Sequence, residues 1–165
     1  MPEMEQHLKE KDIAFLKRAL ELAEIGSTRA DGGPFGALVV KNDQIISEGW
    51  NTVVVSHDPT GHAEVNAIRC ACEKLKHFHL TGCTLYASSE PCPMCLSAAY
   101  WAHVDRIVFA NSRHDAASIG FSDEDIYREL ALPLSERQIS TQQISVNGAN
   151  DVMDRWMRNN EKVAY

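Results

Sequence analysis

Two short motifs constrain this chain more than any other feature: His62-Ala63-Glu64 and, further along, Pro91-Cys92-Pro93-Met94-Cys95. The first places an imidazole and a carboxylate two residues apart. The second places two thiols at the closest spacing that lets both bind one ion. One histidine and two cysteines, with a carboxylate left over, match a catalytic zinc site whose fourth coordination position stays open. The sequence therefore predicts one Zn²⁺ held by His62, Cys92 and Cys95.

Both motifs fall where helices are expected to begin. His62 starts a predicted helix, and Pro93 suits the first position of another, which places Cys92 at its N-cap and Cys95 in its first turn. Helix N-termini carry partial positive charge, which favours thiolate over thiol, and zinc removes the thiol proton outright. Bound zinc also lowers the pKa of its water to about 7. Glu64 can lie beside that water without ligating the metal, and we expect it to act as the catalytic proton shuttle.

Other interpretations of the cysteines stay open. A C-x-x-C pair can be a redox pair or half of a structural zinc site. A structural site needs a fourth cysteine or histidine, and neither Cys70-Ala71-Cys72 nor Cys83 repeats the ligand spacing. Cys72 also falls on the apolar stripe of its helix, where cysteine acts as a small hydrophobic residue. A zinc module without enzymatic activity is a further alternative, and Glu64 is the main argument against it.

Size and charge narrow the class of protein. A chain of 165 residues fits one domain with a real core. We expect no membrane span, and the polar stretch from Met1 to Lys11 does not resemble a secretory signal. Five cysteines without an expected disulfide suit a reducing, cytoplasmic location. A net charge of −7 favours a small uncharged substrate over nucleic acid.

Periodicity predicts an α/β fold. Strands alternate with helices after an opening hairpin that turns at Asn42-Asp43, which favours a single domain over residues 1–165 with a mixed sheet covered on both faces. Helices are expected over residues 7–25, 62–76, 93–103 and 149–161, and strands over residues 35–41, 44–50, 84–88 and 106–110, with a weaker fifth strand over 143–146. The last helix is expected to bury Val152, Met153, Trp156 and Met157.

The two motifs resemble those of the cytidine deaminase superfamily. Within that superfamily, nearly the whole chain resembles bacterial guanine deaminases, with the segment from Asp115 to Asp123 and the terminal Tyr165 as its most specific matches. The resemblance implies a three-layer α/β/α sandwich around a mixed five-stranded sheet. Further matching segments are Gly33-Pro34-Phe35-Gly36-Ala37, Asp58-Pro59-Thr60, His62-Ala63-Glu64-Val65, Glu90-Pro91-Cys92-Pro93-Met94-Cys95 and Tyr100-Trp101-Ala102.

The same resemblance implies an activity and a set of substrate contacts. Guanine would be hydrolysed to xanthine and ammonia by attack of zinc-bound hydroxide on the amino-bearing carbon, with one Zn²⁺ per subunit. It implies a homodimer whose C-terminal helix and tail, about residues 149–165, are exchanged between subunits. The substrate-binding residues that it implies are Asn51 and Asp123 for the edges of the base, Ala63, Trp101 and Phe35 for the pocket wall, and Tyr165 for closure of the site.

Local chemistry alone favours plainer roles for several of these residues. Asp123 would cap a helix in Ser122-Asp123-Glu124-Asp125, Trp101 and Phe35 would pack in the core, and a terminal Tyr165 would be frayed. The chain also departs from the family pattern at Gly61, at Ser122 and in the residues before the final tyrosine. These departures concern the choice of substrate and leave the zinc chemistry untouched.

Two alternative activities share the zinc motifs. A tRNA adenosine deaminase would flip a base out of an anticodon loop and should carry a basic tract. The tail after Asp151 instead mixes Arg155, Arg158 and Lys162 with acidic residues. A deaminase of cytosine or of a related aminated base or nucleoside is the other alternative, although a site closed by Tyr165 leaves little room for ribose.

Overall fold

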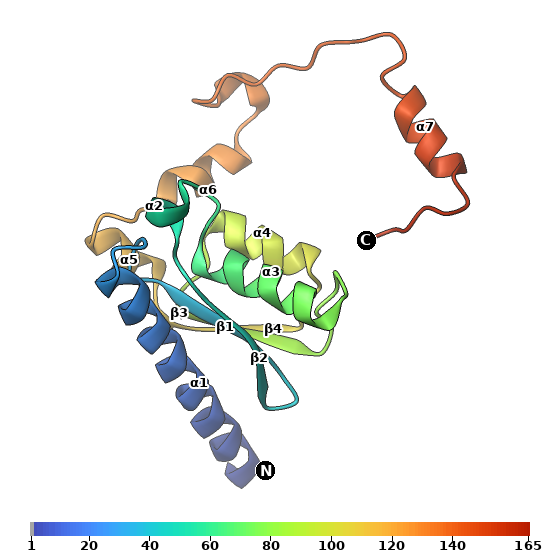
Figure 1. Cartoon of the computed structure of the whole chain (residues 1–165). Helices are drawn as coiled ribbons and strands as arrows, with labels where there is room; N and C mark the ends of the chain where they lie inside the picture. Colours follow the sequence, from blue (N-terminus) through green and yellow to red (C-terminus); the bar gives the residue numbers. More distant parts are fainter. Residues whose placement is uncertain (1) are drawn as a thin grey trace. The chain divides into compact units, whose positions relative to one another are not determined.

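The sheet has four strands in this computed structural model, which describes residues 2–165, with side chains from residue 5 onward. They are β1 (Gly36–Lys41), β2 (Gln44–Trp50), β3 (Cys83–Ser89) and β4 (Arg106–Asn111). Their order is β2-β1-β3-β4, with β1 antiparallel to both neighbours and β3 parallel to β4. Three strands, β2, β3 and β4, therefore run in one direction and end at the same edge of the sheet (Figure 1).

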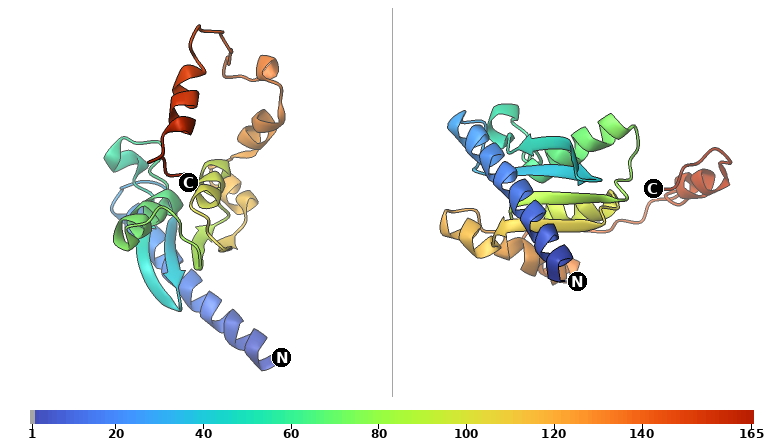
Figure 2. Two further views of the ribbon diagram at one scale, coloured as in Figure 1. Left: turned by 90° about the vertical axis from the view of Figure 1, so that its right-hand side faces the viewer. Right: turned by 90° about the horizontal axis from the view of Figure 1, so that it is seen from below.

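Helices cover both faces of this sheet, which confirms the predicted layers. Helix α1 (Pro2–Thr28) crosses one face, and α3 (Ala63–Leu75) with α4 (Pro93–Trp101) covers the other (Figure 2). Successive residues of β1 point to opposite faces: Leu38 packs toward α1 and Val39 toward α3. Helix α1 is longer than the predicted 7–25, whereas α3 and the four strands match their expected ranges within about two residues.

The opening hairpin turns where the sequence predicts it. Asn42 and Asp43 have φ angles of 50° and 61°. Positive φ at both central residues is typical of the type I′ turn, whose twist matches that of the flanking strands. The hairpin register returns the chain so that Gly36 lies opposite Trp50 at the edge where β2 ends.

The predicted fifth strand is wrong. Residues 143–146 are irregular, and Ile144 and Val146 are 76% and 66% exposed. Two apolar residues in alternation match the strand period, but a strand also needs a neighbour for its backbone groups, and β4 remains an edge strand in this chain.

The chain divides into two compact units, of which the first ends at Asp123 and the second spans Glu124–Tyr165. The second unit contains α6 (Glu124–Ala131), a 3₁₀ turn (Leu134–Glu136) and α7 (Asp151–Arg158). The prediction that the last helix buries its apolar face is wrong for this chain. Its side chains Val152, Met153, Trp156 and Met157 are 59%, 67%, 45% and 62% exposed, because nothing within the unit packs over them.

Two short helices in the first unit were not predicted: α2 (Val53–Ser56) after β2 and α5 (Arg113–Ser118) after β4. Each is shorter than two turns, too short for a hydrophobic period to be read in the sequence. In the described residues, no helix combines the length and the apolar character that a membrane crossing requires.

Candidate metal and substrate site

The predicted zinc ligands, together with Asn51 and Phe35, lie at the edge where β2, β3 and β4 end. Asn51 follows β2 directly, Cys92 begins the helix that follows β3, and α5 begins two residues after β4. Phe35 reaches the same edge from the other direction, because it immediately precedes β1 and its carbonyl accepts a hydrogen bond from Asn51 N at 3.0 Å. Ligand sites in open α/β sheets occur at this edge, outside the carboxyl ends of the strands.

Three ligand atoms form a nearly equilateral triangle. Nδ1 of His62 lies 3.6 Å from Sγ of Cys92 and 3.5 Å from Sγ of Cys95, and the two sulfurs lie 3.6 Å apart. Tetrahedral zinc, with bonds of about 2.3 Å to sulfur and about 2.0 Å to nitrogen, separates two sulfurs by about 3.8 Å and nitrogen from sulfur by about 3.5 Å. The side chains therefore fit one face of a zinc tetrahedron, and in the described part of the chain they are the one His/Cys/Asp/Glu group with such convergence.

Helix starts position these ligands as the sequence predicts. His62 is the N-cap of α3, with φ −72° and ψ 153°, and Cys92 is the N-cap of α4, with φ −63° and ψ 168°. Neither side chain makes a capping hydrogen bond, so both remain directed at the common ion position. Pro93 occupies the first turn of α4, where its missing N–H costs nothing.

Asn66, which was not predicted as a site residue, holds the loop that precedes His62. Its Nδ2 donates to Trp50 O at 2.9 Å, to Thr52 Oγ1 at 3.0 Å and to Gly61 O at 3.3 Å. These bonds tie the end of β2 to the residue before the histidine ligand. An asparagine in the first turn of a helix that starts at a ligand was the available signal, because such a side chain can reach back to the preceding loop.

Glu64 lies inside the protein beside the ligands. The residue is 8% exposed, and burial raises the pKa of its carboxyl to about 7. The two thiols differ in pKa: the side-chain hydrogen bond between them lowers the pKa of Cys92 to about 4 and, together with burial, raises the pKa of Cys95. A buried carboxyl with a pKa near neutrality is suited to accept and return protons.

Asn51 is buried and held in one orientation. Its Oδ1 accepts hydrogen bonds from Gly33 N at 3.3 Å and from Val53 N at 3.1 Å. A Cβ at residue 32 would lie 2.0 Å from this Oδ1, so Gly32 leaves the space that the amide fills. The oxygen is thereby occupied, and the Nδ2 of Asn51 has no partner among residues 2–165, which leaves it available as a donor.

Asp123 and Phe35 both belong to the first unit, and Phe35 packs against its hydrophobic core, as local chemistry favours. Asp123 directly precedes α6 at the end of the first unit, and burial raises its pKa, with the charges of Cys92 and Glu90 acting in the same direction. Phe35 is half-buried and packs edge-on against Phe121, with ring centroids 5.0 Å apart.

The remaining predicted substrate contacts differ in burial. Ala63, the first residue of α3, is fully buried. Trp101, the last residue of α4, is 66% exposed, so the core-packing alternative is wrong for it. Tyr165 belongs to the second unit and is 73% exposed.

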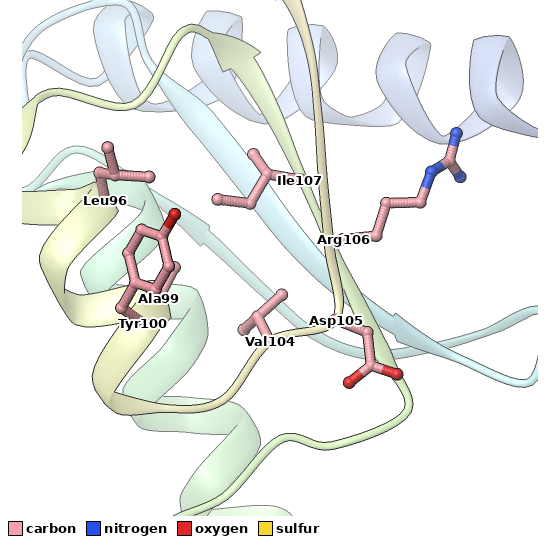
Figure 3. A pocket seen from close by; sticks show the side chains of 7 residues that line it. All are labelled: Leu96, Ala99, Tyr100, Val104, Asp105, Arg106 and Ile107. Carbon is pink, nitrogen blue, oxygen red and sulfur yellow. The ribbon is translucent and has the colours of Figure 1, made fainter.

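A separate cavity of about 260 Å³ lies between α4 and β4 and contains none of the predicted site residues. Leu96 and Tyr100 face it from α4, and Ile107 faces it from β4, whereas Arg106 points away toward α1 (Figure 3). Tyr100 is 76% exposed, so this apolar hollow opens on a solvent-exposed face beside the unpaired edge strand.

Comparison with known proteins agrees with this geometry. Residues 9–111 match the family described as the cytidine and deoxycytidylate deaminase zinc-binding region. The chain belongs to this deaminase family. The matched residues include His62, Glu64 and both cysteines, and they end with β4.

Individual relatives place the chain more narrowly within the deaminases. The guanine deaminase of Bacillus subtilis is 46% identical over 92% of this chain and 97% of its own length, and its X-ray structure superposes with a TM-score of 0.90. This chain belongs to the guanine deaminase branch. A guanine deaminase structure from Nitrosomonas europaea is 36% identical over 67% of this chain and 64% of that one, with a TM-score of 0.63. A tRNA-specific adenosine deaminase of Buchnera aphidicola is 40% identical but covers only 61% of this chain and 61% of its own length.

Proposed function

We propose that this protein hydrolyses guanine and water to xanthine and ammonia. The observation that carries the proposal is the zinc-sized triangle of His62, Cys92 and Cys95 with buried Glu64 beside it. The near full-length similarity to a guanine deaminase selects the base. The reaction replaces the C2 amino group by oxygen: water supplies the oxygen, a C–O bond forms, and the C–N bond breaks to release ammonia.

The metal ligands and Glu64 divide the chemistry. One zinc per subunit, held by His62, Cys92 and Cys95, would supply a water activated at neutral pH. Glu64 takes a proton from the attacking water and delivers it to N3 of the ring, and it later protonates the departing amine. Its burial places the carboxyl away from bulk solvent, so the protons that it carries pass between water and substrate.

Asn51 and Asp123 would read two edges of the base. Because Oδ1 of Asn51 is occupied by two backbone N–H groups, this residue contributes an N–H donor and selects a ring edge with an acceptor. Guanine presents N–H donors at N1 and at its 2-amino group. The carboxylate of Asp123 would accept hydrogen bonds from both. Ala63 and Phe35 would form the pocket wall, and Trp101 and Tyr165 would close it from regions that are exposed in the isolated chain.

Ammonia release from a panel of substrates tests the proposal. The zinc-loaded protein should act on guanine and should show at most about 1% of that rate on guanosine, adenine, cytosine or tRNA, because a buried polar site rejects bases that leave its groups unpaired. Glu64→Ala is the matched control for contaminating deaminases. Rapid ammonia release from another member of the panel, with none from guanine, would overturn the assignment.

The tRNA alternative makes a contrary prediction. A protein that binds tRNA through phosphates loses affinity steeply as salt rises. The net charge of the chain is −7, and the tRNA-specific relative covers 61% of the chain, against 92% for the guanine deaminase of Bacillus subtilis. Salt-sensitive tRNA binding together with conversion of an anticodon adenosine would establish the alternative.

We also propose that the protein works in the cytoplasm as a homodimer whose residues 149–165 are exchanged between subunits. Support comes from the exposed apolar face of α7 and the exposed face formed by α4 and β4, both of which a second copy could cover. The five cysteines, all free in the structure, suit a reducing compartment.

Co-expression of two inactive variants tests the exchange. One variant carries Glu64→Ala with an intact tail, and the other keeps Glu64 but lacks residues 149–165. In an exchanged heterodimer, the intact tail reaches the site that retains Glu64, so activity should return to one of the two sites. Tails that close their own sites would leave the heterodimer inactive and would contradict the exchange.

A further inference from the structure

Helix α5 is fixed at both ends although it is only six residues long. At its N-terminus, Ser112 Oγ accepts from Asp115 N at 3.2 Å, and the Asp115 carboxylate accepts from Ser112 N at 2.8 Å. This reciprocal pair is a capping box. The start of the helix is therefore held by hydrogen bonds, although none of the residues of α5 is buried.

At its C-terminus, α5 ends in a Schellman motif. Gly120 has a φ of 96°, Gly120 N donates to Ala117 O at 3.0 Å, and Phe121 N donates to Ala116 O at 3.0 Å. This pattern of bonds fixes the direction in which the chain leaves a helix, and it requires a positive φ that glycine adopts at little cost. The position of Phe121 follows from the motif.

Phe121 then docks on the loop that leads into β1. Its ring meets Phe35 edge-on, at 5.0 Å between centroids and 89° between planes. Gly33 lies directly beneath the pair: a Cβ there would be 2.9 Å from Cζ of Phe121 and 3.0 Å from Cε2 of Phe35. Phe121 remains 48% exposed, so its contact with Phe35 lies at the surface of the unit and contributes little to the core.

The contact between Phe121 and Phe35 connects the two residues that we propose to bind the base, Asn51 and Asp123. On one side, Gly33 N holds Oδ1 of Asn51 and Phe35 O accepts from Asn51 N. On the other side, Asp123 follows Phe121 by two residues and is half-buried near Cys92. Glu90, which follows β3, holds the start of α5, because its carboxylate accepts from Arg113 N at 3.0 Å and its own N–H donates to Asn111 O at 2.8 Å.

We propose that Phe121, seated on Phe35 over Gly33, is a positioning residue that sets the place of Asp123 and so determines how tightly the donor edge of guanine is held. The inference rests on the proposed function. It adds a role for a residue that does not itself touch the reacting atoms. A carboxylate on a segment of irregular chain binds well only if that segment is held before the substrate arrives.

Guanine binding in a protein that cannot turn it over tests this role. In the zinc-loaded Glu64→Ala background, equilibrium dialysis with labelled guanine should show an increase in Kd of about 5- to 10-fold for Phe121→Ala, because the segment must be ordered on binding. Phe121→Leu should recover most of the affinity. Ile119→Ala, at the neighbouring exposed position that ends α5, is the matched control and should leave Kd within about 2-fold.

A double-mutant comparison separates positioning from a general loss of structure. If Phe121 acts through Asp123, Phe121→Ala should change Kd by less than about 2-fold once Asp123→Asn is present. The inference would be overturned if the two substitutions raised Kd independently, so that their fold-changes multiplied in the double variant. An unchanged Kd in Phe121→Ala alone would also overturn it. Gly33→Ala displaces the ring while retaining it, so it gives a second measurement if Phe121→Ala does not fold, and it too should raise Kd.

Wild-type activity distinguishes a failure of the proposed function from a failure of the proposed role of Phe121. Zinc content and guanine turnover of the wild-type protein are measured in parallel with the binding series. A wild-type protein without guanine turnover overturns the proposed function. Normal turnover with no effect of either Phe121→Ala or Gly33→Ala overturns only the role of Phe121.

Discussion

The stretch from Ala19 to Ala102 and the unit from Glu124 to Tyr165 both contain many apolar side chains, but only the first stretch buries them. Every fully buried hydrophobic residue in the described chain lies in the first stretch. The second unit leaves Ile126, Leu130 and the apolar face of α7 exposed. The comparison shows that the zinc ligands and Glu64 are built into a region with its own core, whereas the second unit needs another surface to cover it.

The largest expected effects concern the two tasks of the site in the first unit. Cys92→Ser removes a metal ligand, so zinc content and guanine turnover should both be lost. Glu64→Ala leaves the three ligands in place, so zinc content should persist while turnover falls by at least about 10²- to 10⁴-fold. Metal analysis and ammonia release measure the two quantities on the same samples. Loss of zinc from Glu64→Ala would show that its carboxylate helps to hold the metal.

A core substitution and a surface substitution compare the two regions directly. Leu85 is fully buried in β3, and Leu85→Ala should reduce the free energy of unfolding by about 2–5 kcal/mol through lost contacts and a cavity. Trp156→Ala, at a side chain that is 45% exposed, should change the unfolding of the first unit by less than about 0.5 kcal/mol.

The same pair also sharpens the dimer proposal. Trp156→Ala should reduce the solution mass at a given protein concentration, because it removes apolar area from a face that a second copy would cover. Leu85→Ala serves as the control, since it lies in the sheet interior. Unfolding in urea and light scattering provide the measurements, and an unchanged mass for Trp156→Ala would count against exchange through α7.

The smallest expected effect concerns charge. Asp12 of α1 accepts hydrogen bonds from Arg106 and Tyr86, and the bond from Arg106 is the main reason that its pKa lies below the usual value. A lowered pKa in the folded state stabilises the protein above about pH 4 and loses that contribution as pH falls further. Asp12→Asn should therefore flatten the loss of stability below pH 4, at a cost of about 1 kcal/mol near neutrality.

A matched ion pair in the second unit provides the contrast. Arg128 and Asp125 pair across one turn of α6 with both side chains largely exposed. Asp125→Asn should change stability by less than about 0.5 kcal/mol at any pH, because water screens an exposed pair. Melting curves between about pH 3 and pH 7 measure the stability of the two variants. If stability depended on pH in the same way in both, the ion pairs of the two regions would not differ in strength.

Local patterns predicted much of the first unit. The ligands follow from residue type and spacing, the hairpin from Asn42-Asp43, and the main helices and strands from their periods. The fifth strand and the buried face of α7 failed for one reason: a period shows which side of an element is apolar, but it does not show what covers that side. The contacts of Asn66 with Trp50 and of Phe121 with Phe35 were missed because these partners lie far apart in the sequence.

The sequence by itself determined the reaction type, because one histidine, two cysteines and a spare glutamate have few other uses at these spacings. The order of the strands was left to the tertiary structure. With β1 antiparallel between β2 and β3, the ends of β2, β3 and β4 come to one edge, and that edge brings the thiols to within 3.6 Å of the imidazole. The tertiary structure also decided which atom of Asn51 is free, since two backbone amides occupy its oxygen. Spacing along a chain sets which ligands are available, and only packing sets the distances between them.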